Sequence, residues 1–322
     1  MPATRVDRRW VNGEMGPRVL VIGEVLIDIV RTPDGQVSEH VGGSPANVAT
    51  GLARLDHPTD FASTLGRDER GTAALAHLKR HGVETLPSSR TAHPTSVADA
   101  TLDESGAATY IFALHWNLAP VPIRSGVGHL HTGSIAATQP PGGELVVRTI
   151  REARDDATVS YDPNIRPSIM GAAEHVRPRI EELIALSDVV KASEDDLDYL
   201  HPGRPIEDVL LAWSHLGAAL TVVTLGGDGV AYRVPATGEV CRVPAAVTDP
   251  AAVVDTVGAG DSFMAGLISA LLDAGLLGSA DSRLRLRTAD RAAIDPAITR
   301  ALATSGVTVR HQGAYSPTRN EL

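Results

Sequence analysis

The stretch that decides the fold is Asp255-Thr-Val-Gly-Ala-Gly-Asp261, which runs directly into Ser262-Phe-Met-Ala-Gly-Leu-Ile-Ser-Ala-Leu-Leu272. The second half predicts a helix, because apolar residues recur at i, i+4, i+7 and i+8 from Phe263. The two glycines before it leave the first helical amides bare at the positive end of the helix, which favours an anion. Asp261 stands at the same end. The stretch predicts an anion site with a proton acceptor and, equally well, a simple helix cap.

The composition is ordinary for a globular protein and argues against several functions. The 322 residues suffice for one large α/β domain or two domains. Acidic residues outnumber basic ones by 39 to 29, and the net charge of −10 argues against a nucleic-acid partner. The single cysteine, Cys241, cannot form an internal disulfide or a cysteine metal cage. The apolar runs are too short to span a membrane, and residues 1–17 have no apolar signal region, so we expect an N-terminal tail on a cytoplasmic protein.

Outside this stretch, alternating strand and helix signals predict a doubly wound, mostly parallel sheet with helices on both faces. Short apolar runs predict strands at 18–23, 60–65, 128–132, 158–161, 188–191, 220–224 and 238–243. Periodic segments predict helices at 44–55, 69–81, 144–154, 179–186, 194–200, 262–272 and 296–305. Two hairpins, at about 27–41 and 95–114, interrupt the pattern and are expected to pair as a small projecting sheet, which would serve as a lid, a dimer surface or both.

Polar groups gather at the predicted strand ends and helix starts. In Gly42-Gly-Ser-Pro-Ala-Asn47, Ser44 is expected to be the helix N-cap with Pro45 at the first helical position. Asn47 then either points to water or binds a small polar ligand. The segment Asp162-Pro-Asn-Ile-Arg166 follows a parallel strand, where open α/β sheets bind ligands. Gly226-Gly-Asp-Gly229 either brings backbone close to a ligand or forms a hairpin turn.

Phosphoryl transfer is the chemistry that best fits these features. Neither lysine of the chain, Lys79 or Lys191, lies in a P-loop motif. A dinucleotide fingerprint is also missing after the first strand, which counts against a dehydrogenase. The amides of residues 258–260 can clamp a phosphoryl group in place of a P-loop, and Asp261 can take the proton of an attacking hydroxyl.

Two long motifs resemble the signatures of the ribokinase-like (pfkB) carbohydrate kinases. Residues 42–55 look like the N-terminal signature of that family, and residues 255–266 look like its C-terminal one. The resemblance covers residues 18–322 and implies a single domain with a three-layer α/β/α sandwich and a small β lid. It implies that ATP and Mg²⁺ are used to phosphorylate a sugar hydroxyl, and it points to K⁺, used by some members, and to a homodimer through the lid. No nucleic-acid or membrane partner is expected.

The resemblance also implies roles for individual residues. Asp261 matches the catalytic base, with Gly258, Ala259 and Gly260 as the anion hole. The positions that match substrate contacts are Asp28, Gly42, Gly43, Asn47, Asn164 and Arg166. The positions that match the nucleotide pocket are Ser193, Thr224, Gly226, Gly229, Ala301 and Ser305. Asp196 matches a position near Mg²⁺, and Asp255 matches a ligand of the monovalent cation.

Within this family, the residues look most like those of bacterial fructokinases, so fructose is the leading substrate. Kinases of 2-keto-3-deoxygluconate are second, since an arginine in a similar loop can pair with the sugar carboxylate; Arg166 can equally pair with a neighbouring acid or with ATP phosphate. A nucleoside or another ketose is third. His115, Trp116 and Asn117 follow the second hairpin and are expected either to influence sugar choice or to pack in a dimer interface. The alternative of another class is an inactive sugar- or nucleotide-binding regulator, which the intact Gly-Ala-Gly-Asp argues against.

Overall fold

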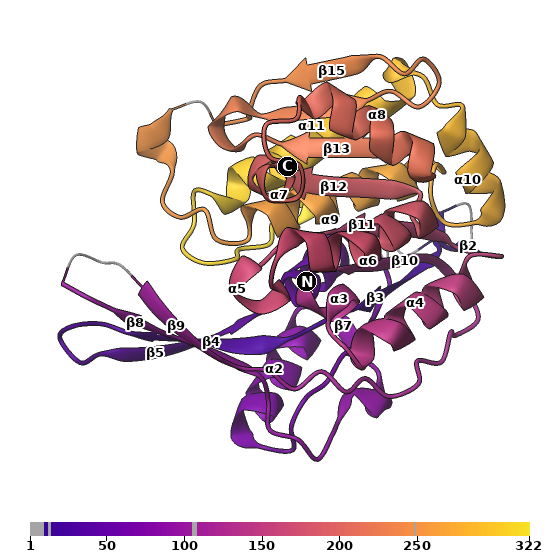
Figure 1. The fold of residues 1–322 in the computed structure, drawn as a ribbon. Coiled ribbons are helices and arrows are strands. Elements are labelled where there is room, and N and C mark those ends of the chain that lie inside the picture. Colours follow the sequence, from indigo (N-terminus) through magenta and orange to yellow (C-terminus); the bar gives the residue numbers. More distant parts are fainter. Residues whose placement is uncertain (1–9, 12–13, 105–107, 248) are drawn as a thin grey trace, which may run out of the picture.

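A nine-stranded sheet forms the centre of the fold (Figure 1). The computed structural model describes residues 10–11, 14–104, 108–247 and 249–322. The strand order is β15-β14-β13-β12-β11-β10-β3-β6-β7, and all pairs are parallel except those that involve β14 and β15. The bounds are β3 Arg18–Ile22, β6 Thr59–Ala62, β7 Val83–Thr85, β10 Val127–Gly133, β11 Thr158–Asp162, β12 Val189–Ser193, β13 Leu220–Thr224, β14 Val230–Arg233 and β15 Val240–Val243.

Helices cover both faces of this sheet and enclose one apolar core on each side. The first face carries α1 Ser44–Arg54, α2 Glu69–Arg80, α9 Ala259–Asp273, α10 Ala280–Arg287 and α11 Arg291–Thr308. The second carries α3 Ser134–Thr138, α4 Gly142–Ala153, α5 Pro167–Met170, α6 Ala173–Leu186, α7 Glu194–Leu200 and α8 Ile206–Leu216. Because the central strands are buried on both faces, they read as continuous apolar runs. The predicted three-layer α/β/α sandwich is confirmed.

A smaller, four-stranded sheet projects from the body beside α2 (Figure 1). Its order is β5-β4-β8-β9, with β4 Leu26–Arg31, β5 Val37–Gly42, β8 Val97–Leu102 and β9 Ala108–Ala113. The two predicted hairpins form it, and they join through the parallel pair β4–β8. The turn between β8 and β9, at 105–107, lies outside the described residues. Most of the predicted tail, residues 1–9 and 12–13, also lies outside them, while β1 Trp10–Val11 pairs with β2 Glu14–Met15.

Several predicted boundaries are wrong for identifiable reasons. The strand expected at 60–65 ends at Ala62. The helix expected at 179–186 begins at Ala173, and the one expected at 296–305 begins at Arg291, capped by the Asp290 carboxylate. Both helices contain a proline close to the predicted start, Pro178 or Pro296, although proline is unfavourable inside a helix. The elements α8, α10 and β14 were not predicted.

Within the described ranges, no helix combines the length and the apolar character needed to cross a bilayer.

Candidate functional site

Polar residues meet at one edge of the central sheet, where its parallel strands end. Glu24 follows β3, Ser134 follows β10, and Asp162, Ser193 and Thr224 are the last residues of β11, β12 and β13. Carboxyl ends of parallel strands form the usual ligand crevice of open α/β sheets. The start of α9 reaches this edge, because a Cβ added at Gly260 would lie 3.2 Å from Lys191 Nζ on β12.

The start of α9 offers backbone donors to an anion. Gly258 is the N-cap in a left-handed conformation with φ 75°, and a Cβ there would lie 2.5 Å from the Ala314 Cβ, so only glycine fits. The Ala259 amide already donates to the Thr256 carbonyl at 3.2 Å. Among the described residues, the amides of Gly258 and Gly260 have no backbone acceptor. These two amides are therefore better phosphate donors than that of Ala259.

The Asp261 carboxylate is held by two donors from α1. Ser44 Oγ donates to Oδ1 at 2.7 Å, and Asn47 Nδ2 donates to Oδ2 at 2.8 Å. The prediction that Ser44 caps α1 is wrong: Gly43 is the N-cap and the Ser44 side chain makes no capping bond. The physical reason is that the Ser44 hydroxyl is committed to a stronger, charged acceptor. Asp261 itself lies in the first turn of α9, beyond the cap position.

Close packing of α1 against α9 brings Ser44 and Asn47 within hydrogen-bonding distance of the Asp261 carboxylate. A Cβ added at Gly51 of α1 would lie 2.6 Å from the Ala265 Cβ on α9. The glycine therefore lets the two helix backbones approach each other four residues after Asp261. This approach sets the distance across which Ser44 and Asn47 reach the carboxylate.

The residues expected to bind the sugar lie where the small sheet joins the body. Asp28 on β4 pairs in register with His40 on β5, and a Cβ at Gly42 would collide with the Asp28 carboxylate. Burial raises the pKa of Asp28, while the charges of His40 and Arg166 oppose that rise. Gly43 has φ 107°, and a Cβ there would lie 2.6 Å from the Glu24 carbonyl oxygen, so glycine is required at this junction.

A second buried acid, Glu24, was not predicted. Burial raises its pKa to about 7, and the partners that oppose the rise include the Ser134 side chain, the Ala136 amide and Arg166. Ser134 has φ 54°, a strained conformation for a residue other than glycine. Glu24 lines a cavity of about 90 Å³ whose other walls include Ser96, His115, Trp116, Ile135 and Gln139. Its apolar sequence surroundings, Ile22 to Leu26, gave no sign of this environment.

His115 and Trp116 lie against the chain's own body and not on an outer surface of the small sheet. The His115 carbonyl accepts from Thr64 Oγ1 at 2.7 Å, and Trp116 Nε1 donates to the Ala136 carbonyl at 2.8 Å. Both residues border the Glu24 cavity. Their influence on sugar choice and their packing in a dimer interface both stay predictions.

Arg166 also lies at this edge of the central sheet, where its guanidinium donates to nearby backbone carbonyls. Its Nη1 donates to the carbonyl of Ile165 at 2.9 Å and to that of Asn164 at 3.4 Å. Its charge acts on both Glu24 and Asp28. Asn164 has φ 37°, which bends the chain sharply after β11. The charge of Arg166 therefore reaches two nearby acids, and its pairing with a sugar carboxylate or with ATP phosphate stays a prediction.

Lys191 is a cation at the floor of the site that sequence reasoning missed. Its Nζ donates to Asp162 Oδ2 at 2.7 Å, and both side chains are buried. Burial raises the pKa of Asp162 to about 6, although the attraction of Lys191 opposes the rise. Asp261 is among the charges that act on both partners. The available signal was that both residues stand near the ends of adjacent parallel strands.

The residues expected at the nucleotide form two groups. Ser193 and Thr224 are paired across β12 and β13, and residues 226–229 form the predicted hairpin turn to β14, while their contact with a nucleotide stays a prediction. A Cβ at Gly229, which has φ 98°, would lie 2.6 Å from the Ala245 amide nitrogen. On α11, Ala301 is fully buried against Gly266 of α9, and Ser305 Oγ donates to the Leu302 carbonyl. The fold thus brings Ser193 and Thr224 together and leaves Ala301 inside a helix interface.

The two expected metal ligands are both engaged by the protein. Asp196 accepts from the Ile165 amide, from the Ser193 amide and from Ser193 Oγ, which makes it the capping box of α7. Asp255 accepts from the amides of Val257 and Gly313. The described residues contain no group of three or more acids, histidines or cysteines arranged for a metal. The donor set does not fit an all-protein magnesium site, whereas Mg²⁺ held mainly by phosphates and water needs few side chains.

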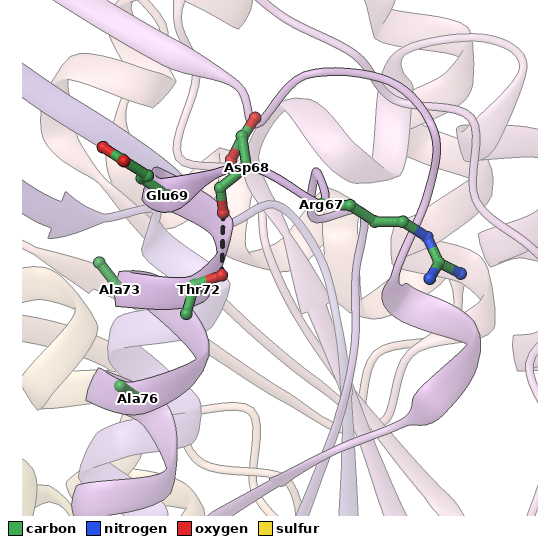
Figure 2. Close-up of a pocket in the computed structure, with 6 residues that line it drawn as sticks. All are labelled: Arg67, Asp68, Glu69, Thr72, Ala73 and Ala76. Carbon is green, nitrogen blue, oxygen red and sulfur yellow. Dashed lines mark hydrogen bonds between the residues drawn. The ribbon is translucent and has the colours of Figure 1, made fainter.

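A separate hollow lies along the start of α2 and is lined by Arg67, Asp68, Glu69, Thr72, Ala73 and Ala76 (Figure 2). None of these is a predicted site residue. The Asp68 carboxylate is occupied as the cap of α2, because it accepts from Gly71 and from Thr95. The Asp68 carboxylate in this hollow is therefore already engaged in capping α2.

Comparison with known proteins agrees with this geometry. The family described as pfkB family carbohydrate kinase matches residues 17–321. A fructokinase from Rhizobium leguminosarum bv. trifolii is 32% identical over 264 residues, which cover 79% of each chain. A fructokinase from Xylella fastidiosa with bound ATP has a TM-score of 0.79 at 25% identity, covering 94% of this chain and 96% of that one. Aminoimidazole riboside kinase from Salmonella enterica, complexed with aminoimidazole riboside and an ATP analogue, has a TM-score of 0.75 at 25% identity, covering 94% and 98%.

Proposed function

This chain belongs to the pfkB family of carbohydrate kinases, and on that premise we propose that it transfers the γ-phosphate of ATP to fructose, giving fructose 6-phosphate. The observation that carries the proposal is the placement of the Asp261 carboxylate beside the open amides of Gly258 and Gly260. A base and an anion site in one helical turn are what phosphoryl transfer to a hydroxyl requires.

The proposed mechanism divides the work among few groups. A hydroxyl of the sugar, held near Asp28 and Gly43, gives its proton to Asp261 as its oxygen attacks the γ-phosphorus. The amides at the start of α9 hold the moving phosphoryl oxygens, with the Lys191 charge close by. The bond between the γ-phosphorus and the bridging oxygen breaks, and ADP leaves with the electron pair.

Mg²⁺ is proposed to enter with the ATP phosphates, and it supplies charge neutralisation when bound. No step is assigned to Asp196, because its Oδ1 already accepts from the Ile165 amide and its Oδ2 from the Ser193 amide at the α7 cap. Asp255 as a ligand of K⁺, and Ser193, Thr224, Gly226, Gly229 and Ser305 as nucleotide contacts, are parts of the same proposal.

The surroundings of Arg166 support a neutral sugar over a sugar acid. The charge of Arg166 acts on both Glu24 and Asp28, so a carboxylate of 2-keto-3-deoxygluconate at this guanidinium would compete with acids of the chain itself. The relative named as a fructokinase supports the same choice. The small sheet is proposed as the lid over the sugar, and the exposed Tyr110 and Ile111 on β9 support its use in a homodimer.

An ADP-release assay tests the proposal on fructose, 2-keto-3-deoxygluconate, ribose, tagatose and adenosine, each with and without K⁺. We expect the highest kcat/KM with fructose. The Asp261→Asn variant should bind both substrates and lose about 10²-fold to 10⁴-fold in kcat.

Each other outcome points to a specific alternative. Preference for 2-keto-3-deoxygluconate that disappears in Arg166→Ala would replace fructose by the sugar acid. Sugar binding measured by calorimetry, without ADP release on any acceptor, would instead favour the inactive regulator. Near-normal turnover of Asp261→Asn would remove the base from the mechanism.

A further inference from the structure

We propose that Ser44 is a positioning residue, whose hydroxyl holds the Asp261 carboxylate in the orientation that accepts the sugar proton. The inference rests on the proposed role of Asp261 as the base. It assigns a function to a side chain that the sequence suggested only as a helix cap.

The contacts on Asp261 are arranged one to each oxygen. Ser44 Oγ lies 2.7 Å from Oδ1, and Asn47 Nδ2 lies 2.8 Å from Oδ2. Each carboxylate oxygen can accept more than one hydrogen bond, so both keep capacity for a substrate hydroxyl. Two donors from one helix fix the rotation of the carboxylate about its terminal torsion, which is otherwise broad. A fixed plane keeps the remaining lone pairs aimed in one direction.

The Ser44 hydroxyl has no competing local task. Gly43 occupies the N-cap position of α1, and no side chain makes a capping bond there. The hydroxyl instead reaches across 217 residues of sequence to its acceptor. Since alanine is the best helix former, removal of this hydroxyl should cost α1 little intrinsic stability. An effect on turnover would then come through Asp261.

Burial makes the contact effective. Only 8% of Ser44 is exposed, so water replaces its hydroxyl poorly. A hydrogen bond to an ionised acceptor is stronger than one between neutral groups, and a low local dielectric strengthens it further. The bond therefore stabilises the ionised carboxylate, which is the form that accepts a proton.

Charged groups also lie near Asp261. Lys191 on β12 and Asp162 on β11 form an ion pair with each other, and both interact electrostatically with Asp261. The α1 donors, Ser44 and Asn47, are neutral. Loss of the Ser44 hydroxyl removes one donor to the carboxylate and leaves the ion pair in place, so a change in turnover reports on that donor.

The test compares Ser44→Ala with wild type and with Thr50→Val, which removes a buried hydroxyl about 9 Å further along α1. We expect Ser44→Ala to lower kcat about ten-fold or more, because a hydrogen bond to a charged group is lost. The KM for ATP should be unchanged, so the loss should fall on kcat alone. Thr50→Val should keep the wild-type kcat.

A double-mutant cycle separates positioning from a general structural role. In the Asp261→Asn background, where the charged base is gone, Ser44→Ala should reduce the residual single-turnover rate by less than about two-fold. Equal losses in both backgrounds, or a wild-type kcat for Ser44→Ala, would overturn the inference.

The same measurements keep the two proposals distinct. The wild-type rates over the sugar panel judge the choice of fructose, whereas the ratio of Ser44→Ala to wild type on the best acceptor judges the role of Ser44. If another sugar is the best acceptor, the inference about Ser44 still stands or falls on that ratio. A wild-type chain that turns over no acceptor would overturn both.

Discussion

Glu24 is the residue whose ionisation should govern stability near neutral pH. Its pKa rises from the ordinary 4.5 to about 7 on burial. Between these values the unfolded chain is ionised and the folded chain holds a proton, so stability falls as pH rises and then levels off above the folded pKa. We expect wild type to lose about 3 kcal/mol relative to Glu24→Gln across this window. Urea unfolding of both proteins from about pH 5 to pH 8 measures it.

The exposed Glu69→Gln on α2 is the matched control and should show no such trend. A difference between wild type and Glu24→Gln that stays constant with pH would mean that Glu24 is ionised in the folded protein at every pH tested.

Sequence reasoning at this scale found residues whose motif is local and missed those whose partners are remote. Asp261, Asn47 and Gly258 stand in signatures that announce a helix start, and the structure places them at one. Lys191 stands in no such motif and Ser44 was expected only as a helix cap, because their partners, Asp162 and Asp261, are 29 and 217 residues away. A single sequence does not encode which distant side chains will meet.

At the scale of elements, the crossing of α1 and α9 should control turnover. Gly51→Ala adds a Cβ 2.6 Å from that of Ala265, so the helices must separate or shift. We expect a loss of about 1–3 kcal/mol from overpacking, together with a lower kcat as Ser44 and Asn47 move off Asp261. Ala265→Gly returns the space, so the double variant Gly51→Ala/Ala265→Gly should recover kcat in the steady-state assay. A double variant as slow as Gly51→Ala would contradict this account.

Helices and strands could be predicted from the sequence where their residues are buried throughout, and less well where they are partly exposed. Strands such as β3 and β13 read as apolar runs, and α7 has the predicted bounds Glu194–Leu200. The helices α6 and α11 both begin before their predicted starts. They continue through Pro178 and Pro296, residues that usually interrupt a helix. The short strand β14, which lies between β13 and β15, follows a tight turn at Gly229, and the polar helix α10 has little periodicity to detect.

At the scale of the whole molecule, the C-terminal residues tie together the far ends of α1 and α9. Arg319 Nε donates to the Leu55 carbonyl at 2.7 Å, and its Nη1 donates to Asp273 at 2.6 Å. We expect Arg319→Ala to lower the free energy of unfolding by about 2 kcal/mol, because several charge-assisted hydrogen bonds are lost. Arg291→Ala, which breaks only exposed ion pairs, should cost less than about 1 kcal/mol by the same urea titration. Equal losses of unfolding free energy in Arg319→Ala and Arg291→Ala would contradict this stabilising role of Arg319.

The junction at Gly43 has a mechanical consequence. The last residue of β5 is Gly42 and the first residue of α1 is Ser44. Gly43 alone therefore separates the projecting sheet from the helix whose side chains bind the Asp261 carboxylate. The backbone at Gly43 is itself wedged against Glu24 and Val25. Any swing of the projecting sheet must therefore be absorbed by rotation at a single, tightly packed residue or be transmitted to α1. The closure of the proposed lid and the orientation of Asp261, the proposed base, would then both depend on Gly43.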